Sequence, residues 1–184
     1  MPTLMEEIGV SGGFLNNKKV NYLGFSFGEL YYFQYPYPAT REKLDFWDKA
    51  PLILFTGYIP EHRLFQGINL HFIFPDVNRL IFLEKIISYR LKNPRTILNL
   101  AWAERISHMG FSRDEYARIL LSFRNYLPNK VINPVGVPFC KDGSLWKKAF
   151  AQVKPKWHGN NEAGIKGIME SNARELFRGV KGSI

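Results

Sequence analysis

The sequence has one cysteine and four histidines among its 184 residues. The single thiol, Cys140, excludes an intrachain disulfide and a zinc site built from several cysteines, and it indicates a reducing compartment. The histidines are His62, His71, His108 and His158. No two of them have the spacing of a metal-binding pair. We therefore expect neither a metal nor a cofactor.

Long apolar runs are absent as well. No stretch approaches the ~20 consecutive apolar residues of a membrane-spanning helix. The N-terminus carries Glu6 and Glu7 and lacks the basic start and apolar centre of a signal peptide. We expect a cytosolic product with no membrane partner.

Motifs of common enzyme classes are missing. There is no phosphate-binding loop, dinucleotide fingerprint, nucleophile elbow or HExxH motif. Cys140 lies in a proline-rich stretch with only Lys141 as a basic neighbour, which is a poor environment for a nucleophile. These absences favour a non-enzymatic protein.

The composition indicates a folded protein with a basic surface. The hydrophobic fraction is 46%, with 15 Phe, 9 Tyr and 4 Trp, which is typical of a globular domain. Lys and Arg number 25 against 16 Asp and Glu, which gives a formal charge of +9. Such a charge favours polyanionic partners such as DNA, and the alternative is an ordinary solvated surface.

The pattern of the first half predicts β-structure. Runs rich in aromatic and β-branched residues are separated by glycine and proline; the expected strands are residues 20–27, 29–37, 52–56 and 63–74. The first two are expected to form a hairpin. We predict an α+β fold in which a small antiparallel sheet or SH3-like barrel, residues 20–74, is followed by helices packed on it.

The second half changes to helical periodicity. We expect helices over residues 76–92, from 94 to about 110, from 112 to before Pro128, and over 144–153, with residues 129–143 irregular. Ser112 and Glu115 match a capping box. A single domain is expected over residues 20–153, between a flexible arm, 1–19, and a basic tail, 154–184. A sparse apolar stripe in the tail predicts a helix that needs a partner surface.

Basic and aromatic residues interleave in the second half, as in proteins that combine phosphate contacts with base stacking. The candidate nucleic-acid contacts are Arg90, Arg118, Arg124, Lys147, Lys148, Lys154, Lys156 and Trp157. The four lysines are the densest basic cluster. Binding of this kind would be salt-sensitive and tolerant of sequence. The alternative is a solvated helix face over an ordinary aromatic core.

A metal-dependent nuclease is a further alternative. Asp76 and the Glu84–Lys85 pair faintly resemble the acidic pair and lysine with which some nucleases hold Mg²⁺ and orient water. His71 is the histidine that would join them. The residue expected between the glutamate and the lysine is missing, and both lie on a predicted helix.

Three segments and one arginine carry a resemblance to a known family. They are Gly28–Tyr35, Asp45–Leu52, Phe65–Phe72 and Arg79. In this order they resemble a family of small proteins of tailed bacteriophages, mainly contractile-tailed ones. The resemblance implies a phage protein of the virion or head-to-tail assembly type, or one that protects DNA ends. It covers roughly a third of the chain, and after residue 130 the sequence departs from the family pattern.

The same residues can be interpreted physically as a folding motif. Trp47 is expected to cover the start of the strand at Leu52, and Asp48 to accept backbone hydrogen bonds at the Pro51 corner. Gly67 fits a bulge or a close backbone approach. Asn69 and His71 are expected to tie the sheet to that corner.

The leading hypothesis is a phage structural or assembly protein, found in the virion and in the host cytoplasm during assembly. It would form homo-oligomers, contact other phage structural proteins and touch DNA. The alternative is a cytoplasmic nucleic-acid-binding protein that shields DNA ends.

Overall fold

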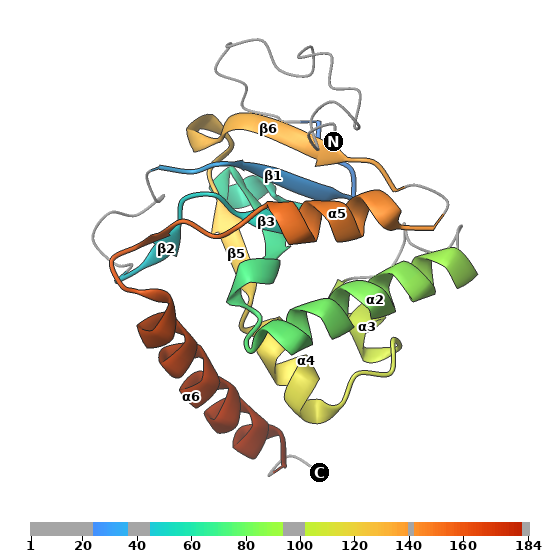
Figure 1. Cartoon of the computed structure of the whole chain (residues 1–184), viewed down its shortest axis with the longest axis vertical. Helices are drawn as coiled ribbons and strands as arrows, with labels where there is room; N and C mark the ends of the chain where they lie inside the picture. The colour runs from blue at the N-terminus through green and yellow to red at the C-terminus, as the bar shows by residue number, and fades with distance from the viewer. Residues whose placement is uncertain (1–23, 37–44, 94–101, 140–141, 182–184) are drawn as a thin grey trace.

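The computed structural model describes residues 24–36, 45–93, 102–139 and 142–181. The arm expected at 1–19 lies outside these residues. Five strands form one antiparallel sheet in the order β5-β4-β3-β1-β6, and a separate two-stranded ribbon pairs β2 with β7. Helices complete the fold, so the predicted α+β class is confirmed (Figure 1).

The sheet is made of strands from both halves of the chain. They are β1 (Leu30–Gln34), β3 (Leu52–Ile59), β4 (Leu64–Asn69), β5 (Phe123–Tyr126) and β6 (Ile132–Val137). The sheet is therefore not confined to residues 20–74, and the irregular stretch predicted at 129–143 contains an edge strand. Strands β5 and β6 form the two ends of the sheet, which is open rather than an SH3-like barrel.

The hairpin predicted for residues 20–37 is wrong in the part that the structure describes. Residues 24–29 contain a turn at Phe27 and Gly28 but no strand, and β1 pairs instead with β3 and β6. Gly24 and Gly28 have φ values of 66° and 74°, which a strand cannot accommodate. Phe25 lies in an aromatic cluster rather than in a strand.

Alternation along β3 separates two cores. Leu52 and Leu54 face the helices, whereas Ile53 and Phe55 face an aromatic cluster on the opposite side of the sheet. Each of these four side chains is at most 1% exposed, so the strand is apolar on both faces. The aromatic cluster comprises Phe25, Phe33, Tyr35, Ile53, Phe55, Phe65 and Tyr126.

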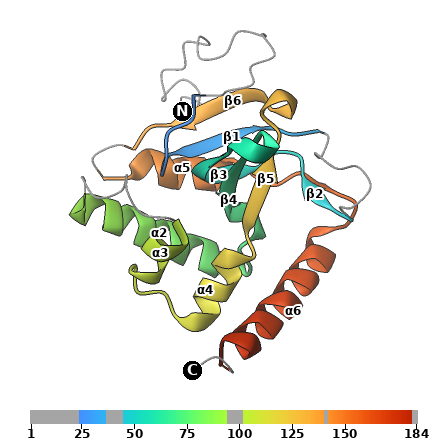
Figure 2. The ribbon, with the colours of Figure 1, turned by 180° about the vertical axis from the view of Figure 1, so that it is seen from behind.

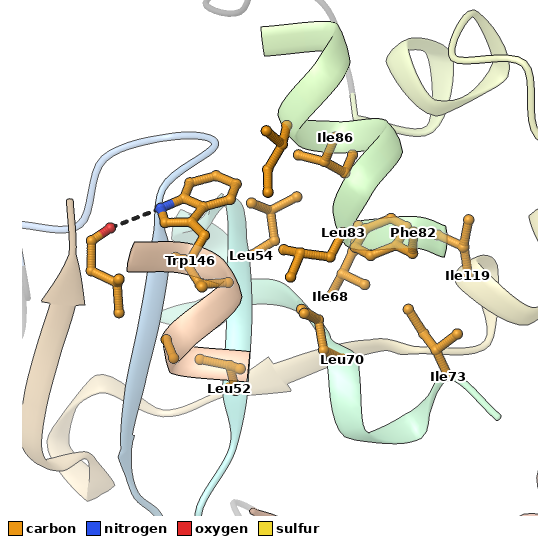
Figure 3. Packing of buried hydrophobic residues seen from close by; sticks show 14 of the residues in the cluster. Leu52, Leu54, Ile68, Leu70, Ile73, Phe82, Leu83, Ile86, Ile119 and Trp146 are labelled. Carbon is orange, nitrogen blue, oxygen red and sulfur yellow. Dashed lines mark hydrogen bonds between the residues drawn. The ribbon is translucent and has the colours of Figure 1, made fainter. Parts of the chain in front are cut away.

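Helices α2 (Asp76–Lys92) and α5 (Ser144–Gln152) contribute to the core on the other face. Both were predicted, α2 with the observed bounds. Trp146 of α5 is fully buried, and its indole N–H donates to the Val137 carbonyl oxygen at 2.9 Å (Figure 3). Between them in the sequence lie α3 (Trp102–Ser107) and α4 (Arg113–Leu120). Helix α4 begins with the predicted capping box at Ser112, but it ends at Leu120, so the predicted continuation toward Pro128 is wrong and β5 occupies that stretch.

Short 3-10 turns, Pro60–His62, Leu70–Phe72 and Pro128–Lys130, follow β3, β4 and β5. The ribbon is formed by β2 (Trp47–Asp48) and β7 (Trp157–His158), and α6 (Glu162–Lys181) follows it. Figures 1 and 2 show α6 beside α4 at the end of the molecule away from β6.

The apolar stripe of α6 packs within the chain. Ile165 and Met169 are buried against Phe72 and Phe74, and the Trp157 ring packs on the same cluster. The sequence predicts a partner surface for this stripe, and the structure supplies that surface from the segment after β4. Ile165 and Met169 of this stripe thus join a third, smaller core, whereas Ile168 is exposed.

Candidate nucleic-acid interface

A buried carboxylate joins the ribbon to the main sheet. Asp48 is 3% exposed, and its Oδ1 accepts hydrogen bonds from the backbone N–H groups of Ala50, at 2.9 Å, and Lys156, at 3.0 Å. Its Oδ2 accepts from Asn69 Nδ2 at 3.2 Å and from His71 Nδ1 at 2.6 Å. The hydrogen bonds expected of Asp48, Asn69 and His71 are therefore present, and they involve both carboxylate oxygens.

Both ring nitrogens of His71 face acceptors. Nδ1 lies against the Asp48 carboxylate, and Nε2 lies 3.1 Å from the carbonyl oxygen of Val153. Because neither partner can donate, this geometry is satisfied when His71 carries a proton on each nitrogen. The pair is then a buried ion pair, which is sustained only when its remaining hydrogen-bonding groups are also satisfied.

Opposing effects set the pKa of Asp48. Burial raises it, but the hydrogen bond and charge of His71, together with the N–H groups of Ala50 and Lys156, outweigh burial and hold the pKa below its usual value. Asp48 is thus a structural anion. It holds residues from three distant parts of the chain in one arrangement.

Gly67 and Arg79 complete the support of this network. A Cβ on Gly67 would lie 2.7 Å from Ile53 Cδ1, and the neighbouring register shift falls between Phe55 and Gly57, so both the close approach and the bulge are found. Arg79 donates to the carbonyl oxygens of Ile73 and His71 and forms an ion pair with Asp76. Gly67 therefore keeps β4 close to β3, and Arg79 fixes the segment that follows β4.

The ribbon presents two different faces. Asp48 and Trp157 are cross-strand partners that point inward, Asp48 to the buried network and Trp157 to Phe72 and Phe74. On the outward side, the Trp47 and His158 rings pack against each other across the strands, with centroids 4.0 Å apart and a tilt of 32° between their planes.

Lysines continue the outward side of the ribbon. The N–H of Lys49 donates to the carbonyl oxygen of Lys156 at 2.8 Å, which places these two residues opposite each other, one step beyond Asp48 and Trp157. Strand β2 ends at Asp48 and β7 begins at Trp157, and continuing their alternation by one residue assigns Lys49 and Lys156 to the side of Trp47 and His158. Lys156 and His158 are exposed, and Lys49 and Trp47 are half-buried. We call Trp47, Lys49, Lys156 and His158 the ribbon face.

Three predicted phosphate contacts are engaged inside the fold. Arg90 forms an ion pair with Glu29 and lies over the Phe139 ring, with 4.2 Å between guanidinium carbon and centroid. Its guanidinium joins α2 to the turn before β1 and, over the Trp146 ring, to α5, and we place it among the structural residues rather than at a DNA-facing surface.

The other two arginines are also occupied. Arg118 pairs with Asp114 at 3.1 Å and donates to the Phe74 carbonyl oxygen. Arg124 lies over the Phe72 ring at 3.9 Å and donates to backbone carbonyls, and burial lowers its pKa. Neither projects toward solvent as the sequence interpretation expected, because nearby carbonyls and rings satisfy each guanidinium.

The lysine cluster is distributed along one surface segment. Lys147, Lys154 and Lys156 are exposed, and Lys148 is half-buried on α5. The sequence has no acidic residue between Asp142 and Glu162, so this segment carries undiluted positive charge. Trp157, grouped with these lysines in the sequence, instead turns into the third core.

The residues proposed for a nuclease do not converge. Asp76 pairs with Arg79, and Glu84 lies two turns further along α2, roughly 12 Å away along the helix axis. Both ring nitrogens of His71 are engaged elsewhere. Over the described ranges no three His, Cys, Asp or Glu side chains are grouped so as to hold a metal ion. The geometry gives the nuclease alternative no support.

From the sequence, Trp47 was assigned to a folding motif, and neither Lys49 nor His158 was selected as a nucleic-acid contact, although His158 directly follows Trp157. They become neighbours of Lys156 only through the pairing of two strands of two residues each. Such strands leave no periodic signal.

None of the helices that the structure describes is long and apolar enough to cross a membrane.

Comparisons with known proteins give one match. Residues 16–144 match the family described as phage T4 terminal DNA protecting protein. Searches of curated proteins and of solved structures give no match. The matched range includes β2 and the Asp48, Asn69 and His71 side chains, but it ends before Val153, Lys156 and the lysines of residues 147–156. Since it covers well over half of the chain, and agrees with the tailed-phage resemblance of the sequence, the chain belongs to the phage T4 terminal DNA protecting protein family.

Proposed function

We propose that this protein binds the ends of linear duplex DNA and shields them from exonucleases. The observation that carries this proposal is the family membership over residues 16–144. The net charge of +9 supports it, because a basic surface raises the local concentration of a polyanion. Protection of this kind requires the protein to occupy the DNA end, and it requires no covalent bond to be made or broken.

The exposed lysines are the proposed phosphate contacts. Lys147, Lys154 and Lys156 follow one another along a segment without acidic residues. Phosphate contacts orient a protein on DNA without reading sequence, and that suits a protector that must act at any terminus. We expect binding that weakens steeply as salt rises.

An exonuclease protection assay tests the function. A linear duplex labelled at its ends is incubated with the full-length protein and then with a double-strand exonuclease, and in parallel with a restriction enzyme that cuts at an internal site. We expect the ends to survive while the internal site is cut normally. Digestion of the ends at the unprotected rate would refute the proposal. Equal protection of both sites would indicate coating of the duplex instead.

This proposal keeps the virion as a location of the protein, but it replaces the structural role by protection of the DNA end. A genome end that enters a cell meets nucleases before any phage gene is expressed, so its protector has to arrive with the DNA. We expect a few copies per particle by quantitative mass spectrometry. A copy number that matches a ring or vertex would instead favour the structural role, and absence from particles would remove the virion from the proposal. Homo-oligomerisation stays a prediction, to be measured by light scattering.

A further inference from the structure

The ribbon face brings two aromatic rings and two lysines together on the described surface. The Trp47 and His158 rings pack against each other with a tilt of 32°, and Lys49 and Lys156 are paired one position further along the ribbon. Here the inward side is already occupied by Asp48 and Trp157, and a second ring pair remains on the outward side.

We propose that the ribbon face receives the terminal base at a DNA end, which stacks on the outer side of the exposed His158 ring, backed by Trp47, while Lys49 and Lys156 contact the adjacent phosphates. This inference rests on the proposed function and assigns it a site. A duplex terminus differs from the interior in having an exposed base face, or a frayed base that can be stacked. An aromatic platform beside cations recognises that feature without reading sequence.

The charges set the direction of the bound strand. Gly159 follows the ribbon so closely that a Cβ there would lie 2.0 Å from the Asp45 backbone oxygen, which places exposed Asp45 at the His158 end. Its carboxylate repels phosphates from that end. The backbone of the strand therefore runs from the ribbon toward Lys156, Lys154 and Lys147, away from Asp45.

The ribbon face is also rigid. Asp48 lies directly beneath it and accepts hydrogen bonds from both sides of the ribbon, from Ala50 N–H and from Lys156 N–H. The inward Trp157 ring packs on Phe72 at 5.0 Å between centroids. Because the platform is fixed before DNA arrives, little conformational entropy is lost on binding.

The test compares two DNA probes and matched variants. One probe is a fluorescent hairpin duplex with one open end, and the other is a dumbbell of the same sequence closed at both ends. The variant His158→Ala removes the exposed ring, and its control is His62→Ala, an equally exposed histidine in the turn after β3. Binding is measured by fluorescence anisotropy, and thermal unfolding verifies that each variant folds.

We expect wild type to prefer the open end, and His158→Ala to bind the open end roughly tenfold more weakly while its affinity for the dumbbell is unchanged. His62→Ala should match wild type. Trp47→Phe keeps a ring and should retain the preference. Lys156→Gln should weaken binding to both probes and lower the slope of log affinity against log salt by about one, in contrast to exposed Lys130→Gln.

The outcomes separate this inference from the proposed function. If wild type shows no preference for the open end, the proposed function fails. If wild type prefers the open end and His158→Ala does so equally, DNA-end binding stands but its assignment to the ribbon face is overturned.

Discussion

Replacing Asp48 by asparagine is expected to remove a large part of the stability of this protein. The substitution keeps the shape of the side chain and can keep the Oδ1 acceptor for Ala50 and Lys156. It puts an NH₂ group where Oδ2 faces two donors, Asn69 Nδ2 and His71 Nδ1. Two favourable contacts become donor–donor contacts, and the His71 charge loses its partner.

Breaking a buried ion pair by removing one partner costs about 3–5 kcal/mol. Loss of two hydrogen bonds to a charged group, at about 1.5–3 kcal/mol each, gives the same range. With a urea dependence of about 2 kcal/mol/M, a loss of about 4 kcal/mol lowers the unfolding midpoint by about 2 M. Urea unfolding followed by circular dichroism measures it. Glu84→Gln, on the exposed side of α2, changes the same charge and should leave the midpoint almost unchanged.

The acid dependence of stability provides a second check. The folded-state pKa of Asp48 is held below its usual value, so its stabilisation is present above the unfolded pKa, about 3.9, and is lost as pH falls through the folded value. The free energies of unfolding of wild type and Asp48→Asn should therefore converge below about pH 4. A midpoint difference under about 0.5 M at neutral pH, or one that stays constant into acid, would refute the reasoning.

Other changes test the remaining supports of the fold by thermal or urea unfolding. Gly67→Ala puts a methyl group 2.7 Å from Ile53 Cδ1 and should destabilise by about 1–3 kcal/mol, whereas an unchanged melting temperature would contradict the close approach. Ile165→Ala in α6 should cost about 2–5 kcal/mol if its fully buried side chain docks the helix, in contrast to exposed Ile168→Ala. Ser112→Ala should cost about 1 kcal/mol through loss of the α4 cap, and no loss would mean that the cap is frayed in solution.

Local signals predicted the elements that depend on local physics. Helix α2 has seventeen residues with an apolar stripe, and the capping box at Ser112 is a contact within four residues. Both were found where the sequence placed them. Strands β5 and β6 were missed because their pairing with β4 and β1, rather than their own composition, makes them strands.

In the candidate site as well, some residues could be predicted from the sequence and others could not. Asp48, Asn69 and His71 could be assigned a shared role because buried polar residues near corners and bulges need partners. Charge alone could not distinguish Arg124, which lies over the Phe72 ring, from Lys156, which faces solvent. That distinction depends on which carbonyls and rings surround each residue in the folded chain.

The hydrogen bond from Lys156 N–H to Asp48 joins residues 108 positions apart in the chain. During synthesis, Asp48 leaves the ribosome before Lys156, its hydrogen-bond partner, has been made. His71 is likewise made before Val153, whose carbonyl oxygen faces its Nε2. The network can close only after the ribbon strand β7 has emerged. A fragment that ends at residue 144, where the family match ends, would leave the Asp48–His71 pair incomplete, so expression of a minimal domain has to include the segment through β7.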